Sequence, residues 1–166
     1  MDAATTIADW QPFFAAQLGA AAALAGLVFV GLSINLQKIL AEPALPNRAL
    51  LALAVLLGAV MVSSYVLIPL QDVDSIGAEI LATGAAFSIF GAAVEVHTLR
   101  TRPIRNRRMF LLNMVFLGFA LLPYVIGGTL LIGGNIDGLY WVAGAVIISF
   151  VKAIADAWVL LVEINR

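Results

Sequence analysis

A lysine and an aspartate lie one helical turn apart in the apolar run that closes the chain, SFVKAIADAWVLLVEINR. Lys152 and Asp156 are separated by three apolar residues and followed by the apolar block WVLLV. Side chains at positions i and i+4 are neighbours on one helix face, so these two can form an ion pair. Ionisable residues inside a membrane are costly and mark ion pathways, proton relays or substrate sites. The pair is therefore the first candidate for a functional site.

The composition places this pair in a membrane protein. The chain has 166 residues, of which 63% are hydrophobic and 11% are charged, and its mean hydropathy is +1.04. Soluble domains are about half apolar and about a quarter charged. We expect an all-α polytopic membrane protein with a single transmembrane domain over residues 1–166, because the length leaves no room for a separate soluble catalytic domain.

The residue types that are missing exclude several kinds of site. The chain has no cysteine, which excludes disulfides, thiolate nucleophiles and thiolate metal sites. A single histidine, His97, cannot supply a His-rich metal site within one chain. The formal net charge of −1 gives no reason to expect nucleic acid as a partner. We expect no metal, no cofactor and no catalytic residues, and we expect membrane lipids as the surroundings.

Five apolar runs are long enough to cross a bilayer. A helix of about 20 apolar residues spans a hydrocarbon core about 30 Å thick, and the runs cover roughly residues 13–36, 49–70, 76–99, 109–132 and 139–164. Turn-forming residues separate them. Asn47 and Asp74 are predicted to cap the second and third helices, and Pro12 is predicted in the first turn of the first helix. The expected fold is a compact bundle of five transmembrane helices.

Basic residues fall in alternate loops and indicate the orientation of the bundle. Lys38 and Arg48 lie in the first loop, and the third loop holds five arginines, Arg100, Arg102, Arg105, Arg107 and Arg108. The N-terminal tail and the second and fourth loops hold acidic residues and no basic ones. Because Lys and Arg are retained in the cytoplasm, we place the N-terminus outside and the C-terminus inside. The expected location is the cytoplasmic (inner) membrane of a bacterium.

The arginines of the third loop have two interpretations. The positive-inside rule alone accounts for them. Alternatively, they contact anionic lipid headgroups or a cytoplasmic partner, with about 1 kcal/mol of attraction per charge. Both interpretations remain open from the sequence.

The aromatic residues that begin the last span indicate how deep Lys152 lies. Tyr140 and Trp141 are expected at the outer interface, and Lys152 follows about 11 residues, or about 16 Å, further along the helix. This spacing predicts Lys152 near the middle of the membrane and Asp156 one turn closer to the cytoplasm. In one alternative the span ends near Trp158 and Lys152 reaches the inner interface. In another the two charges form a purely structural ion pair, although dehydration costs several kcal/mol per ion.

Polar residues of three other spans are expected at a similar depth. Asn35 lies near the inner end of the first span, Glu95 in the third and Asn113 in the fourth. With Lys152 and Asp156 they all fall in the cytoplasmic half of the bundle. We therefore predict a polar cavity that opens toward the cytoplasm, with Lys152 at its apex.

Two helix faces bear on how the helices pack. In the first span one face carries Gln17, Leu24, Val28 and Asn35, which predicts either a pore lining with a constriction at Leu24 and Val28 or an ordinary packing face. The third span carries a stripe of mostly small residues that ends at a carboxylate: Gly77, Gly84, Ser88, Gly91 and Glu95. Small residues allow membrane helices to approach closely.

These features favour a transport function. Five helices barely enclose a pathway, so we expect a homo-oligomeric channel or carrier for an ion or a proton. In this hypothesis Lys152 and Asp156 form a charged switch and Glu95 is a second titratable group. The amides expected to contact the passing species are Asn35, Asn113 and Gln17. The alternative is a non-catalytic membrane subunit that stabilises or regulates a larger complex. An enzyme is not expected, since neither a Ser-His-Asp set nor a His-rich metal site is present.

Overall fold

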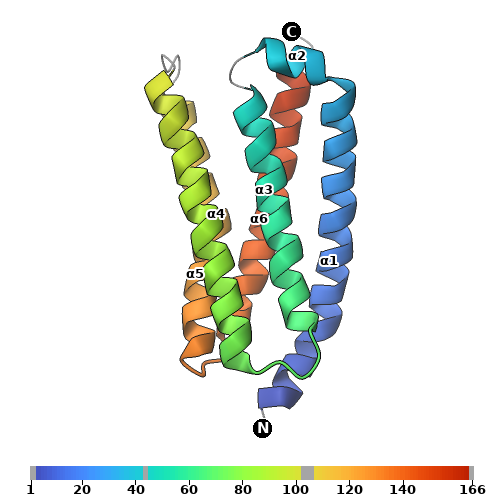
Figure 1. Cartoon of the computed structure of the whole chain (residues 1–166), viewed down its shortest axis with the longest axis vertical. Coiled ribbons are helices and arrows are strands. Elements are labelled where there is room, and N and C mark those ends of the chain that lie inside the picture. The colour runs from blue at the N-terminus through green and yellow to red at the C-terminus, as the bar shows by residue number, and fades with distance from the viewer. Residues whose placement is uncertain (1–2, 43–44, 102–106, 165–166) are drawn as a thin grey trace.

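Residues 3–42, 45–101 and 107–164 are described by the computed structural model, and they form six α-helices with short connections (Figure 1). The helices are α1 (Ala3–Ile34), α2 (Leu36–Ala41), α3 (Leu45–Leu67), α4 (Val73–Thr101), α5 (Arg107–Ile132) and α6 (Gly138–Ile164). All of them except α2 are long and apolar enough to cross a membrane. The prediction of an all-α chain with five helices able to span a membrane is confirmed for the described residues.

The five long helices lie roughly along one direction, with the two chain termini at opposite ends of the bundle (Figure 1). α3 lies between α1 and α4, α6 lies behind α3, and α4 pairs with α5. The short α2 crosses the end of the bundle where the chain finishes, which we call the C-terminal end. In this view α4 inclines away from α3 toward the C-terminal end. The principal core contains buried side chains from all five long helices, among them Phe14, Val62, Ile80, Tyr124 and Val142.

The first helix begins ten residues earlier than the sequence predicted, at Ala3 instead of residue 13. Pro12 consequently lies inside the helix and not in its first turn, which corrects that prediction. A proline in a helix interior removes one backbone hydrogen bond. Aromatic packing supports the helix here, because the Trp10 ring meets Tyr140 of α6 edge to face at 4.8 Å between ring centroids and Phe14 at 6.0 Å. Tertiary contacts therefore extend α1 beyond its apolar run.

The first helix also ends earlier than predicted, because the backbone turns at Asn35. Asn35 has φ −105° and ψ 14°, and its side-chain amide donates a hydrogen bond of 3.0 Å to the Gly31 carbonyl. After this turn α2 lies against the ends of α3 and α6, where Ile39 is buried with Leu45 and Leu160. The predicted span of residues 13–36 is therefore divided between α1 and α2.

Two predicted helix caps are wrong, for different reasons. α3 begins at Leu45, so Asn47 lies in its first turn, and the Asn47 amide donates to Thr98 Oγ1 of α4 at 2.9 Å. Asp72 caps α4 in place of Asp74, accepting hydrogen bonds from the Ser75 amide at 3.0 Å and the Ser75 hydroxyl at 2.8 Å. These bonds stabilise the carboxylate and lower the pKa of Asp72 below its ordinary value of 3.8.

The small-residue stripe of the third span packs against α5 inside the same chain. Gly77, Gly84 and Gly91 face Leu131, Tyr124 and Leu117, and both sets of residues step by seven along antiparallel helices. A Cβ atom at Gly84 would lie 2.8 Å from the Tyr124 Cβ, which is too close. Since the stripe is occupied within one chain, it gives no support to a homo-oligomer. The same register brings Glu95 of α4 opposite Asn113 of α5.

Candidate functional site

Lys152 and Asp156 form an ion pair that is buried inside the chain. Lys152 lies 14 residues after the first residue of α6 and 12 before its last, so it is close to the middle of the helix. Both residues are 1% exposed, and the Lys152 ammonium contacts Asp156 Oδ2. A charge enclosed in this way is retained only with partners close by, because water no longer solvates it.

A second cation, Arg48 of α3, shares the Asp156 carboxylate. The Arg48 Nε donates a hydrogen bond of 3.0 Å to Asp156 Oδ1, while the other carboxylate oxygen accepts from Lys152. The side chain of Arg48 is 31% exposed and that of Asp156 is 2% exposed. Asp156 therefore contacts two cations that differ in exposure: Lys152 is fully buried, whereas Arg48 is partly exposed.

Arg48 was predicted in a loop and was not predicted as a site residue. Because Arg48 lies near the start of the second span, the positive-inside rule alone accounted for it. One sequence feature points to it in retrospect. Asp156 lies about two turns from the end of α6, and an arginine near the start of an adjacent antiparallel helix has a side chain long enough to span that difference in depth.

Glu95 and Asn113 form a second polar pair between α4 and α5. The Asn113 side-chain amide donates to Glu95 Oε1 at 2.6 Å, and Glu95 is 4% exposed. The glycines along α4 hold the two helices close enough for this bond. One turn further along α4, Thr98 accepts from Asn47 and donates to the Val94 carbonyl. The Asn47 bond links α3 to α4 beside the Glu95 pair.

A cavity of about 190 Å³ lies between Arg48 and the pair formed by Glu95 and Asn113. It lies at the C-terminal end of the bundle, between the start of α3, the end of α4 and the start of α5. The residues that line it are Asn47, Arg48, Leu51, Glu95, Thr98, Phe110 and Asn113. Arg48, Lys152 and Asp156 all interact electrostatically with the Glu95 carboxylate across this region. We call Arg48, Glu95, Lys152 and Asp156 the charged cluster.

The charged cluster and its cavity bring together four of the residues that the sequence singled out, namely Lys152, Asp156, Glu95 and Asn113. Asn35 lies elsewhere, between α1 and α2, in a groove of about 240 Å³ that it shares with Val28 and Leu161. Gln17 is half-buried in α1, toward the opposite end of the bundle.

The face of α1 that carries the proposed constriction packs inside the chain. Val28 is 9% exposed and lies in a small apolar cluster with Leu56 of α3 and Ala153 of α6, and Leu24 packs against this cluster. Both side chains thus contribute to contacts between α1, α3 and α6. Of the two interpretations of this face, a pore lining or an ordinary packing face, these contacts fit the second.

The arginines of the third loop are only partly described. Arg100 at the end of α4 and Arg108 at the start of α5 are exposed. Arg102 and Arg105 lie outside the described residues, and so does the side chain of Arg107. Arg100 and Arg108 belong to the ends of α4 and α5 that lie at the C-terminal end of the bundle.

Buried hydroxyl groups continue from the charged cluster toward the N-terminal end. Ser149 lies one turn before Lys152 on α6, and its hydroxyl shares a hydrogen bond of 3.2 Å with the Tyr124 hydroxyl of α5. Ser149 also lies 3.5 Å from the Ala120 carbonyl oxygen. A separate pair joins α3 to α4, where the hydroxyl of the half-buried Tyr65 is 3.2 Å from Thr83 Oγ1. Each of these hydroxyls can both donate and accept a hydrogen bond.

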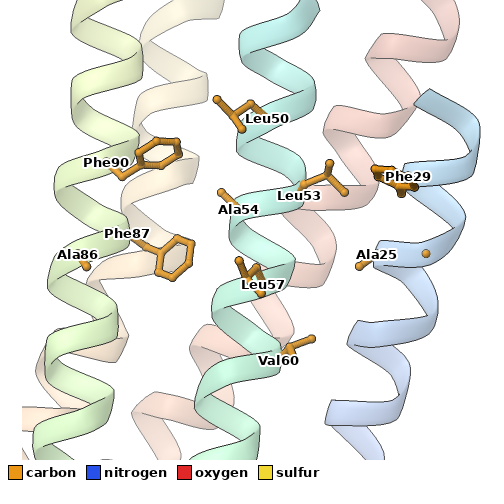
Figure 2. Close-up of a pocket in the computed structure, with 11 residues that line it drawn as sticks. Ala25, Phe29, Leu50, Leu53, Ala54, Leu57, Val60, Ala86, Phe87 and Phe90 are labelled. Atoms are coloured by element: carbon orange, nitrogen blue, oxygen red, sulfur yellow. The ribbon is translucent and has the colours of Figure 1, made fainter. Parts of the chain in front are cut away.

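A larger, apolar groove of about 700 Å³ lies on another face of the bundle (Figure 2). Figure 2 shows its walls: Phe87 and Phe90 extend from α4 toward α3, and Phe29 and Ala25 lie opposite on α1. Small residues, among them Ala54 and Ala86, also line the groove. It contains no charged side chain, so it is separate in its chemistry from the charged cluster.

Two tests bear on the identity of the chain. Among the described residues, no group of three or more His, Asp or Glu side chains is arranged to hold a metal ion. Comparison of the chain with protein-family models, with curated proteins and with solved structures found no match. The function of the chain is therefore inferred from the geometry of the charged cluster and its cavity.

Proposed function

We propose that this chain is a transport protein that moves a small ion or a proton across a membrane through the charged cluster. The observation that carries the proposal is the placement of two cations and two carboxylates within the helical bundle, beside a polar cavity. In this proposal the membrane is the cytoplasmic membrane of a bacterium, and the C-terminal end of the bundle faces the cytoplasm, as the positions of Lys and Arg indicate.

A purely structural role explains the charged cluster poorly. Burying an ion pair costs several kcal/mol per ion, and apolar residues of similar volume are often equally or more stabilising. In a bundle whose principal core is apolar, Leu or Met at positions 152 and 156 would pack without this cost. Retaining charge there is reasonable if the charge binds or passes something.

The path that we propose runs through each chain and not along an axis between chains. From the cavity it passes Glu95 and Lys152 and continues along the hydroxyls of Ser149 and Tyr124 toward the N-terminal end. A homo-oligomer remains part of the proposal only as an assembly of such chains. Intrachain packing of Leu24 and Val28 favours this arrangement over a shared pore.

Flux measurements on purified protein in liposomes test the proposal. Under an imposed pH or salt gradient, protein-bearing liposomes are expected to pass protons or ions faster than empty ones. Glu95→Gln keeps the carbonyl oxygen that accepts from Asn113 but removes the charge, so we expect it to reduce flux at least about tenfold with a small change in Tm. The matched control is Glu42→Gln, an exposed residue at the same end of the bundle. Equal flux in empty and protein-bearing liposomes for protons and for common salts would contradict transport.

The second candidate function is a membrane subunit of a larger complex, and the apolar groove favours it. A groove of about 700 Å³ lined by alanines and phenylalanines could accept a helix of a partner protein. Ala86→Phe narrows the groove and leaves the charged cluster unchanged. If the chain is a transporter, this substitution is expected to leave flux intact, whereas loss of cellular function with normal flux would favour the subunit.

A further inference from the structure

Opposite charges face the same cavity without forming an ion pair with each other. Arg48 and Glu95 both line the cavity. Within the described parts of the chain, the two ion pairs both involve Asp156, and neither joins Arg48 to Glu95. The two side chains are nonetheless close enough to interact electrostatically. A molecule placed between them could therefore contact both.

Within the part of the chain that the structure describes, each of these groups has hydrogen-bonding capacity left for such a molecule. A guanidinium carries five N–H donors in a planar fork, and Arg48 uses its Nε donor for Asp156. That leaves the two terminal nitrogens, which suit a carboxylate or a phosphate. Glu95 accepts from Asn113 through Oε1, which leaves Oε2 for an ammonium group.

The charge of the cluster favours a ligand without net charge. Arg48 and Lys152 supply two positive charges, and Asp156 and Glu95 supply two negative charges, so the ionised cluster is balanced. A lone cation or anion entering the cavity would add an unbalanced charge in a region of low dielectric. A zwitterion adds no net charge. Its anionic group can contact the terminal nitrogens of Arg48, and its cationic group can contact Glu95 Oε2.

We propose that the cavity binds a small zwitterion, whose anionic group contacts Arg48 and whose primary ammonium contacts Glu95. The volume of about 190 Å³ equals that of about six water molecules in the liquid, which limits the ligand to the size of a small amino acid or an aminoethyl phosphate. Leu51 and Phe110 give the cavity an apolar wall for the carbon atoms of the ligand.

This inference deepens the proposed function by adding a bound ligand without net charge at the site past which the ion or proton would move, and it relies on that function only for the statement that the ligand is transported. Two sources supply the same chemistry: a free amino acid and the headgroup of phosphatidylethanolamine. Both carry a primary ammonium and an anionic group a few bonds apart. The experiment below separates the two sources.

The test measures binding at equilibrium, without flux. The full chain is placed in phosphatidylcholine nanodiscs, and its Tm is recorded with glycine, L-alanine, methylammonium or acetate at equal ionic strength. A ligand that binds only the folded protein raises Tm with its concentration. We expect glycine and alanine to raise Tm, and methylammonium and acetate, each carrying one charge, to leave it unchanged. In a parallel arm, phosphatidylethanolamine replaces half of the lipid.

Two substitutions and their controls assign the effect to the cavity. Glu95→Gln and Arg48→Gln each remove one of the two charges, and each is expected to weaken the apparent affinity at least about tenfold. Glu42→Gln and Lys38→Gln remove exposed charges at the same end of the bundle and are expected to change nothing. If Arg48→Gln does not fold, Glu95→Gln decides the result, because its amide still bonds to Asn113.

The outcomes separate the sources and the hypotheses. If the lipid headgroup is the ligand, phosphatidylethanolamine raises Tm in the natural protein but not in Glu95→Gln, and added glycine then has little effect. If a free amino acid is the ligand, glycine raises Tm in both lipids. The inference is overturned if no zwitterion and no lipid gives a shift that Glu95→Gln removes, or if methylammonium alone matches glycine. Binding of glycine without flux of protons, salts or glycine itself would refute transport and leave this inference standing.

Discussion

Asp156 holds two cations, so its removal should cost more stability than the removal of either cation. Replacing Asp156 with leucine leaves Lys152, which is 1% exposed, without its carboxylate. Replacing Lys152 with methionine leaves Asp156 paired with Arg48 at 3.0 Å. The structure therefore predicts an asymmetry between two substitutions that remove the same ion pair.

The magnitudes follow from what each substitution leaves behind. Breaking a buried ion pair and leaving a charge unpaired costs about 3–5 kcal/mol, which is the expected cost of Asp156→Leu. Lys152→Met removes one charged hydrogen bond, at about 1.5–3 kcal/mol, and the apolar methionine suits the interior. The expected difference between the two variants is about 2 kcal/mol, taken between the centres of these ranges.

The double variant Lys152→Met with Asp156→Leu provides the internal control. It removes both buried charges and leaves Arg48, whose side chain is 31% exposed and borders the cavity. No enclosed charge then remains unpaired at these positions, so the double variant is expected to be more stable than Asp156→Leu alone. The changes in unfolding free energy caused by substituting two residues in direct contact do not add when one substitution compensates for the other.

Reversible unfolding in mixed detergent micelles measures these free energies, with helical circular dichroism as the signal. The natural protein, both single variants and the double variant are compared under one set of conditions. The reasoning is refuted if Lys152→Met costs as much as Asp156→Leu, or if the double variant loses the sum of the two single losses. Either result would mean that Arg48 does not share the carboxylate as described.

Two further predictions concern helix packing and helix capping. Gly128→Ala places a Cβ atom 2.6 Å from the Leu81 amide nitrogen of α4, so we expect a loss of about 1–3 kcal/mol in unfolding free energy; Gly144→Ala, which meets no atom within 4 Å, should be neutral or stabilising. The lowered pKa of Asp72 means that its contribution to folding is present above pH 3.8 and is lost as the pH falls below this value. The protection of the Ser75 amide against hydrogen exchange, relative to the rate of an unstructured peptide at the same pH, should therefore fall on acidification in the natural protein, and Asp72→Asn should abolish most of this change. An unchanged melt for Gly128→Ala, or a protection of Ser75 that does not change with pH, would contradict these accounts.

The sequence was sufficient for the apolar spans but not for the helix ends. Apolar length alone predicts which segments are helices able to cross a membrane. The ends depend on contacts that composition does not show. Trp10 packs on Tyr140 and extends α1, and Asn35 bonds to Gly31 where the backbone turns. Asp72 and Asp74 are both plausible caps by type, and only the position of Ser75 relative to the turn distinguishes them.

The charged cluster was predictable in part, for a physical reason. Depth along a helix can be counted from the sequence at a fixed rise per residue, so Lys152, Asp156 and Glu95 could be assigned to one region. The direction in which each helix face points within the bundle cannot be counted in this way. Because of this direction, Asn35 lies away from the cavity and Arg48 contacts Asp156. A long basic side chain near a helix end can extend either way, and its partner decides which.

The unequal positions of the two cations suggest how the cluster can hold its structure and still exchange a ligand. Lys152 is enclosed beside Asp156 and neutralises it whatever Arg48 does. Arg48 can therefore turn some of its donors to an incoming anionic group without leaving a buried carboxylate unpaired, which would be the costly state. Were Lys152 absent, Arg48 would be the nearest cation to Asp156 and would be held there. In our proposal Lys152 thus keeps Asp156 neutralised beside the transport path, while Arg48 and Glu95 bind the ligand.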